Sequence, residues 1–206
     1  MLTALPLQAK ITVSTSKIAE RRYHHGDLRA ALLAEGLRLV ESSGADAISL
    51  REVARATGVS ATSVYRHFPD KRALMTALAQ EGVRRLGEAQ HAAAAGAGGG
   101  TDAFSAVGCA YVRFALANPG LFRLTFTYPG IDVGDPTSDA AASLLHDHAL
   151  EMAHGDARQA RIVALRAWAL VHGLALLMLD GRVPPSDALI DAAIGAVVIA
   201  DKLPRS

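Results

Sequence analysis

The segment from residue 49 to residue 71, SLREVARATGVSATSVYRHFPDK, constrains the fold of this chain more than any other. Ser49 is a good helix N-cap, and Glu52 stands three residues further on, which is the spacing of a capping box. Gly58 follows, and glycine ends a helix easily because it tolerates a left-handed backbone. Ser60 can then cap a second helix. The segment therefore predicts two short helices joined by a tight turn.

Small and apolar residues recur in this segment at the offsets of a helix-turn-helix. Ala54 is small where two helices must cross closely, Gly58 lies four residues later in the turn, and Val64 lies six residues after that. In a helix-turn-helix the second helix lies in the major groove of DNA, with its polar face outward. The alternative for this pattern alone is an ordinary helical hairpin with a solvated polar face.

The segment from residue 23 to about residue 86 resembles the N-terminal domain of the tetracycline-repressor (TetR) family of transcriptional regulators. The matching pieces are ISLREVARATGVS and VYRHFPDKRAL, preceded by the helix-forming run LRAALLAEGLRLVESSGADAIS. The most specific part is the spacing of Tyr65, Phe68 and Lys71. The resemblance implies a three-helix DNA-binding head, an all-helical regulatory body and a homodimer.

Seven residues on and around the second helix of the motif are candidates for contact with DNA. They are Arg51, Thr62, Ser63, Tyr65, Arg66, His67 and Lys71. Arg66 suits guanine or phosphate, and the hydroxyl groups of Thr62 and Ser63 suit base edges. The tyrosine, the lysine and Arg51 suit phosphates, which position a protein without reading sequence. The histidine could serve either purpose.

Charge is distributed unevenly along the chain, although its net value is only +1. Residues 1–85 carry 13 Lys and Arg against 8 Asp and Glu, whereas residues 86–206 carry 8 against 12. A basic part joined to an acidic part is typical of a DNA-binding domain attached to another module, although so modest a difference can also arise by chance. We predict a flexible arm over residues 1–20, a helix-turn-helix domain over residues 21–70, and a helical ligand-binding and dimerisation domain over residues 71–206.

The hydrophobic periodicity predicts an all-α fold of about nine helices. Apart from the two helices of the motif, they are expected at about residues 28–43, 71–95, 101–117, 121–128, 138–153, 157–180 and 186–201. The run GAGGG at residues 96–100 is expected to form a loop, and Thr101 to cap the helix after it. A single cysteine, Cys109, excludes an internal disulfide. No apolar run is expected to be long enough to span a bilayer.

Aromatic residues concentrate in the run LFRLTFTY, at residues 121–128, of a chain that is otherwise poor in them. Trp168, His172 and Gly173 resemble the Trp-His-Gly signature of one TetR-type C-terminal domain. The candidate wall of a cavity for a small apolar effector comprises Tyr111, Phe114, Phe122, Phe126, Leu145, Trp168 and His172. Core packing is the plainer interpretation of each of these residues, and His172 could equally be a hydrogen-bonded core or interface histidine.

The segment 157–180 is apolar on nearly all sides, so we expect it to be buried on more than one side. In a small protein such burial indicates contact between subunits as well as a core. Together with the segment 186–201, two copies would form a four-helix interface. The sequence therefore predicts a homodimer through the last two helices.

No motif indicates an enzyme or a cofactor. The chain lacks a nucleophile elbow, an HExxH motif and a Gly-rich nucleotide loop. Asp147, Glu151 and His154 would share one helical face as possible metal ligands, but a solvated polar face is the better interpretation without further ligands. We expect a cytoplasmic, ligand-responsive repressor that binds a near-palindromic operator. The alternatives are a helical interaction module without specific DNA binding, or a small-molecule enzyme.

Overall fold

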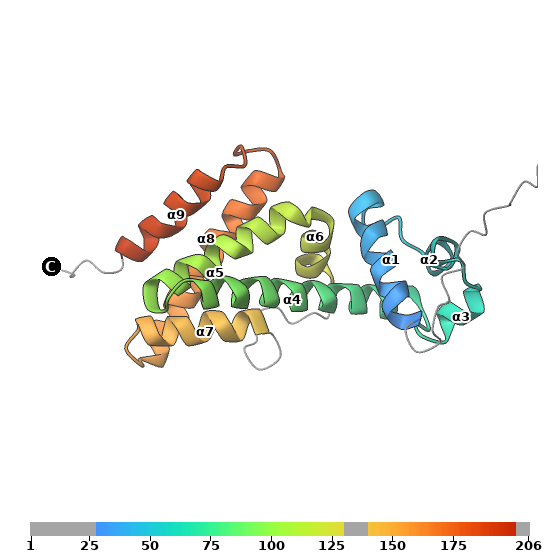
Figure 1. The fold of residues 1–206 in the computed structure, drawn as a ribbon, viewed down its shortest axis with the longest axis horizontal. Coiled ribbons are helices and arrows are strands. Elements are labelled where there is room, and N and C mark those ends of the chain that lie inside the picture. The colour runs from blue at the N-terminus through green and yellow to red at the C-terminus, as the bar shows by residue number, and fades with distance from the viewer. Residues whose placement is uncertain (1–27, 130–139, 201–206) are drawn as a thin grey trace, which may run out of the picture.

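The computed structural model describes residues 28–129 and 140–200, and this part of the chain folds into nine α-helices (Figure 1). The N-terminal helices are α1 (Leu28–Ser43), α2 (Leu50–Thr57), α3 (Ala61–Tyr65) and α4 (Lys71–Gly96). The others are α5 (Gly100–Ala117), α6 (Pro119–Thr127), α7 (Ala140–Met152), α8 (Ala157–Leu179) and α9 (Asp187–Ala200). The predicted all-α class is confirmed, whereas the predicted arm over residues 1–20 lies outside the described residues.

The helix-turn-helix is held by the caps that its sequence predicts. The side chain of Ser49 accepts a hydrogen bond from the backbone N of Glu52 at 3.1 Å, and Gly58 ends α2 with a φ of 75°. The side chain of Ser60 accepts from the backbone N of Ser63 at 3.2 Å, at the start of α3. These bonds satisfy amides that have no partner within their own helix, so each helix begins at a defined residue.

The long helix α4 joins the head, which comprises α1, α2 and α3, to the body, which comprises the helices that follow (Figure 1). Leu74 and Leu78, in the first turns of α4, are fully buried. A Cβ atom on Gly36 of α1 would lie 3.0 Å from a methyl group of Leu78, so α1 and α4 approach closely there. Farther along, α4 packs against α5, α6 and α7. One continuous hydrophobic core therefore extends from the head into the body.

Three boundaries differ from the predicted ones. α5 begins at Gly100, with Gly99 at its N-cap and no side-chain cap, so Thr101 lies inside the helix. Pro119 opens α6, two residues before the predicted start at residue 121. α7 ends at Met152, and His154 follows with a φ of 52°. Because His154 lies beyond the helix, the predicted alignment of this residue with two acidic residues on one helical face does not form.

The composition of α8 corrects one expectation, and its exposure bears on a second. Within the described part of the chain, α8 is the one helix that is long and apolar enough to cross a membrane, by length and composition only. The expectation that no run approaches that length is wrong, because residues 162–179 contain one charged residue, Arg166. α8 packs against α5 and α7. Its buried residues are Ala160, Val171, Ala175 and Met178. Burial on more than one side is therefore not met within a single chain.

Candidate nucleic-acid interface and effector site

The second helix of the motif, α3, presents most of its candidate DNA-binding side chains to solvent. Thr62, Tyr65, Arg66 and His67 are exposed, and Ser63 is half-buried. α3 ends at Tyr65, and Arg66 is its C-cap. Even so, the helical turn continues past that point, because the backbone N of His67 donates to the carbonyl oxygen of Val64 at 3.0 Å. The exposed residues therefore stand on one rigid turn.

Ser63 contributes to the N-terminal cap of α3 as well as to its exposed surface. Its hydroxyl group lies 2.9 Å from that of Ser60, and its backbone N donates to the same Ser60 oxygen. A hydroxyl group has one donor and two acceptor positions, so it can contact a base edge while it keeps this bond. Thr62 makes no such cap contact and is the more accessible of the two.

Lys71 also makes a structural contact that the sequence did not indicate. Its Nζ donates to the carbonyl oxygen of Asp46 at 3.0 Å, which ties the start of α4 to the loop between α1 and α2. The two residues are 25 positions apart, so no local pattern could have revealed the bond. An ammonium group has three donors, and the exposed Lys71 retains two of them for a phosphate.

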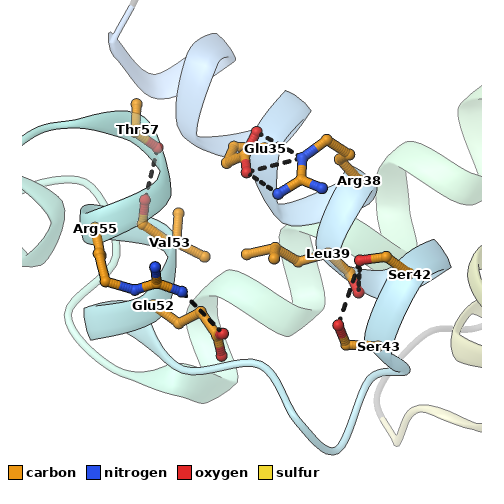
Figure 2. A network of polar contacts seen from close by, with 9 residues as sticks. All are labelled: Glu35, Arg38, Leu39, Ser42, Ser43, Glu52, Val53, Arg55 and Thr57. Carbon is orange, nitrogen blue, oxygen red and sulfur yellow. Dashed lines mark hydrogen bonds and ion pairs between the residues drawn. The ribbon is translucent and has the colours of Figure 1, made fainter.

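Ion pairs on α1 and α2 determine which arginine side chains of the head remain available for contact with phosphate. Figure 2 shows Arg38 paired with Glu35 on α1, at 2.6 Å, and Arg55 paired with Glu52 on α2, at 3.5 Å. The bond from Arg38 also lowers the pKa of the Glu35 carboxyl group. Among the described residues, by contrast, Arg51 and Arg66 make no ion pair. Exposed pairs contribute little stability, but they reduce the charge that Arg38 and Arg55 can offer to phosphate.

Five of the seven candidate effector residues meet in the body and form an aromatic cluster. It consists of Tyr111 on α5, Phe122 and Phe126 on α6, and Trp168 and His172 on α8. The rings of Phe122 and Phe126 lie 4.8 Å apart, and those of Phe126 and His172 lie 5.0 Å apart. The predicted neighbours Trp168 and His172 lie 6.1 Å apart. The consecutive helices α5 and α6 and the more distant α8 therefore share one aromatic site.

A hydrogen-bonded chain runs through this aromatic cluster. The hydroxyl group of Tyr111 is hydrogen-bonded to Nδ1 of His172 at 2.8 Å, and Nε1 of Trp168 donates to the same hydroxyl group at 3.4 Å. Polar groups are thus placed among apolar rings, as in sites that orient a small molecule. The other two candidates are not part of this aromatic cluster. Phe114 is buried in the same hydrophobic core as Tyr111 and Phe122 but makes no ring contact with the cluster among the described residues, and Leu145 packs in a smaller cluster around Phe104.

The partial burial of His172 predicts a loss of stability in acid. Burial lowers the pKa of this imidazole below its ordinary value of 6.5. The unfolded chain therefore takes up a proton first as pH falls, so the contribution of the neutral histidine is present above pH 6.5 and is lost below it. We expect the melting temperature to fall less steeply with acidification in His172→Gln than in the wild type. His67→Gln, at an exposed histidine, is the control and should follow the wild type.

The chain is similar in sequence to two family models and in structure to several bacterial proteins. The model "Bacterial regulatory proteins, tetR family" matches residues 32–78, and the model "Tetracyclin repressor-like, C-terminal domain" matches residues 104–197. A protein of unknown function from Rhodococcus sp. RHA1 is 34% identical, with a TM-score of 0.74 over 88% of this chain and 97% of that one. No curated protein matches the chain.

Two further solved structures share the fold at lower identity. A TetR family transcription regulator from Marinobacter aquaeolei VT8 is 19% identical, with a TM-score of 0.67 over 85% of this chain and 95% of that one. NalD, the secondary repressor of the MexAB-OprM multidrug efflux pump in Pseudomonas aeruginosa, is 18% identical, with a TM-score of 0.58 over 85% of this chain and 95% of that one. At these identities the similarity concerns the fold alone.

Proposed function

The chain belongs to the TetR family of DNA-binding transcriptional regulators, and we propose that it acts as a homodimeric repressor that a small apolar molecule releases from its operator. The observation that carries the proposal is the exposed turn of α3, on which Thr62 and Arg66 stand free while caps hold the helix in place. A rigid helix with outward donors suits the major groove. In this role the protein would act in the bacterial cytoplasm. It would bind DNA and an effector without catalysing a reaction, and it would need no cofactor.

The homodimer would form through the uncovered side of α8, together with α9. Apolar and small residues recur there at intervals of three or four, which places them on one helical face. They are Ile162, Leu165, Ala169, Gly173 and Leu177. No atom lies within 4 Å of a Cβ atom built on Gly173, so this face has room for another helix to approach. Leu189 extends the exposed apolar surface onto α9.

Such a dimer requires an operator with matching symmetry. Two heads related by a twofold axis read two inverted half-sites, so the operator should be near-palindromic. The half-site centres should lie about 34–36 Å apart, or a multiple of that distance, because each α3 must enter the major groove from the same side. Residues 1–20 would serve as an arm, residues 21–70 as the head, and residues 71–206 as the ligand-binding and dimerisation body.

The effector would bind at the aromatic cluster in the body. The mostly apolar wall favours an apolar molecule, and the chain of Trp168, Tyr111 and His172 offers it hydrogen-bonding groups. An effector changes DNA binding only if it binds the DNA-incompetent state more tightly than the DNA-binding state. Leu145 would not contact it in the observed arrangement, because it packs in the smaller cluster around Phe104, and Phe114 shares the core with Tyr111 and Phe122 without a ring contact to the aromatic cluster.

Selection of duplexes from random DNA with the purified protein tests this function. We expect recovery of one inverted-repeat sequence that the protein binds in preference to competitor DNA. A helical interaction module or an enzyme would recover no common sequence. If the selected fragments shared no motif, or a motif without inverted symmetry, the proposal of a homodimeric repressor would be wrong.

Two substitutions should separate base reading from phosphate binding. Arg66→Ala is expected to relax the preference at one base pair and to cost about 1–3 kcal/mol of specific binding. Lys71→Gln should weaken binding to all sequences alike and reduce the salt dependence, because it removes a phosphate contact. Glutamine retains an amide donor for the carbonyl oxygen of Asp46, so the fold of the head is kept. Titrations of the selected operator and its single-base variants at several salt concentrations measure both effects. Unchanged affinity and preference in Arg66→Ala would refute its assignment.

A further inference from the structure

The first turn of α6 is not capped by its own N-cap residue. Asn118 occupies that position but makes no side-chain bond to α6. Its side-chain amide instead donates to the carbonyl oxygen of Phe114, at the end of α5, at 3.0 Å. Pro119 comes next and has no backbone N–H to offer. The first amides of α6 that need an acceptor are therefore those of Gly120 and Leu121.

Glu41, in the last turn of α1, supplies this acceptor from the head. Its Oε2 accepts from the backbone N of Gly120 at 3.0 Å, and its Oε1 accepts from the backbone N of Leu121 at 2.8 Å. A carboxylate is well suited to a helix N-terminus, because its charge strengthens both bonds and the helix dipole favours it. Since both oxygens are used, the two bonds set the orientation of α6 relative to α1 as well as their separation.

The backbones of α1 and α6 touch at this point. A Cβ atom on Gly120 would lie 2.7 Å from the carbonyl oxygen of Val40, so any side chain there would push the two helices apart. Figure 1 shows α6 as the element of the body that faces α1. Glu41 therefore clamps a direct contact between the head and the body.

α6 is also fixed against α4 farther along its length. A Cβ atom on Gly82 of α4 would lie 2.0 Å from Oγ1 of Thr125, so the two helices meet with no space for a larger residue. Beyond the end of α6, the hydroxyl group of Tyr128 donates to the carbonyl oxygen of Arg72 in the first turn of α4, at 3.3 Å. α6 is thus held against α4 as well as α1, the helices that position the head.

The other face of α6 belongs to the aromatic cluster. Phe122 packs against Tyr111 at a ring distance of 5.6 Å, and Phe126 packs against His172 at 5.0 Å. A molecule that inserts between a phenylalanine of α6 and its partner on α5 or α8 presses on Phe122 or Phe126. Because protein interiors are close-packed, the displacement passes to the helix that carries them.

We propose that Glu41 is a positioning residue that couples the aromatic cluster to the DNA-binding head through α6. The inference rests on the proposed function and assigns the route by which the effector site and the operator site influence each other. When α6 shifts, the two bonds from Glu41 carry α1 with it, and α2 packs on α1. Coupling of binding free energies is reciprocal, so operator binding at the head must in turn alter the aromatic cluster.

The chain contains a built-in reporter of the aromatic cluster. Trp168 is the one tryptophan in the sequence, and its indole N–H donates to Tyr111. Its fluorescence, and the quenching of that fluorescence by acrylamide, therefore report on the cluster without any knowledge of the effector. Operator DNA serves as the second ligand of the coupled pair.

The test measures acrylamide quenching of Trp168 in the full chain, with the selected operator duplex and with a scrambled duplex. We expect the operator to change the quenching constant of the wild type, and the scrambled duplex to leave it unchanged. In Glu41→Gln the operator-induced change should shrink about fivefold or more, because one oxygen is replaced by an amino group that cannot accept a bond. Glu35→Gln removes the same charge from the same helix without touching α6, and should behave as the wild type.

The outcomes are distinct. A full operator-induced change in Glu41→Gln, even with a lowered melting temperature, would show that Glu41 is merely structural and would overturn the inference. The inference would also be overturned if the operator bound to the wild type without changing the acrylamide quenching of Trp168. A wild type that does not prefer the operator would instead refute the proposed function. If circular dichroism showed that Glu41→Gln does not fold, Glu41→Asp would replace it. The aspartate side chain is one methylene too short to reach both amides, and the same outcomes would decide the inference.

Discussion

Phe122→Ala is expected to lower the free energy of unfolding by about 3–5 kcal/mol, which is a large part of the stability of a domain of this size. The side chain is 0% exposed and packs against Tyr111, Phe126 and His172. Because the ring is fully buried between side chains of α5, α6 and α8, neighbouring groups cannot collapse fully into the space that it leaves. Urea unfolding followed by circular dichroism, at one fixed protein concentration, measures the loss.

Phe126→Ala is the matched control for this prediction. Phe126 lies one turn along α6 in the same aromatic cluster, but it is only half-buried. Part of its surface already faces solvent, so its removal creates less of a cavity and should cost clearly less. Equal losses for the two variants, or a loss below about 1 kcal/mol for Phe122→Ala, would contradict the packing described here.

Leu165→Glu is expected to dissociate the dimer and to reduce operator affinity by about a hundredfold or more. The side chain is 63% exposed in a single chain, so the substitution should leave the fold of each subunit intact. In the proposed interface it would bury an unpaired carboxylate, which costs several kcal/mol, and each 1.4 kcal/mol is a factor of ten in affinity. Two heads that are no longer joined also lose the gain from binding both half-sites as one unit.

Sedimentation equilibrium and operator titration together test the interface prediction. Gln80→Glu adds the same charge at an exposed position on α4 and is expected to leave the dimer and its operator affinity unchanged. A Leu165→Glu protein that remained dimeric would show that α8 is not at the centre of the interface. Binding of the wild type to lipid vesicles through α8, lost in the same variant, would assign the apolar face to a membrane and not to a second subunit.

The sequence predicted well those features that neighbouring residues decide. The first helix was expected over residues 28–43 and is observed as Leu28–Ser43. Ser49, Gly58 and Ser60 act as predicted, because a cap is a bond between groups three or four residues apart and depends little on the rest of the fold. The errors at Thr101 and His154 fall where glycines adopt left-handed backbones and alter the path of the chain near a helix end.

The candidate effector site was predicted only in part, because some of its contacts are local in sequence and others are not. Trp168 and His172 could be paired from sequence, since residues four apart on a helix are neighbours. Tyr111 and Phe126 were included among the candidate effector residues on the basis of residue type alone. Leu145 looked equally suitable, yet it lies in a different cluster, because the rotation of α7 relative to α8 is set by packing and not by the composition of either helix.

By itself the sequence determined the helices, their caps and the outward row of polar groups on α3, since these follow from periodicity and from hydrogen bonds within a single turn. Only the tertiary structure decided that Glu41 caps α6 at Gly120, 79 residues later, that Lys71 holds the loop at Asp46, and that α8 keeps an uncovered apolar side. Such contacts join groups distant in sequence, and their free energy depends on how whole helix faces fit together. No local pattern carries that information.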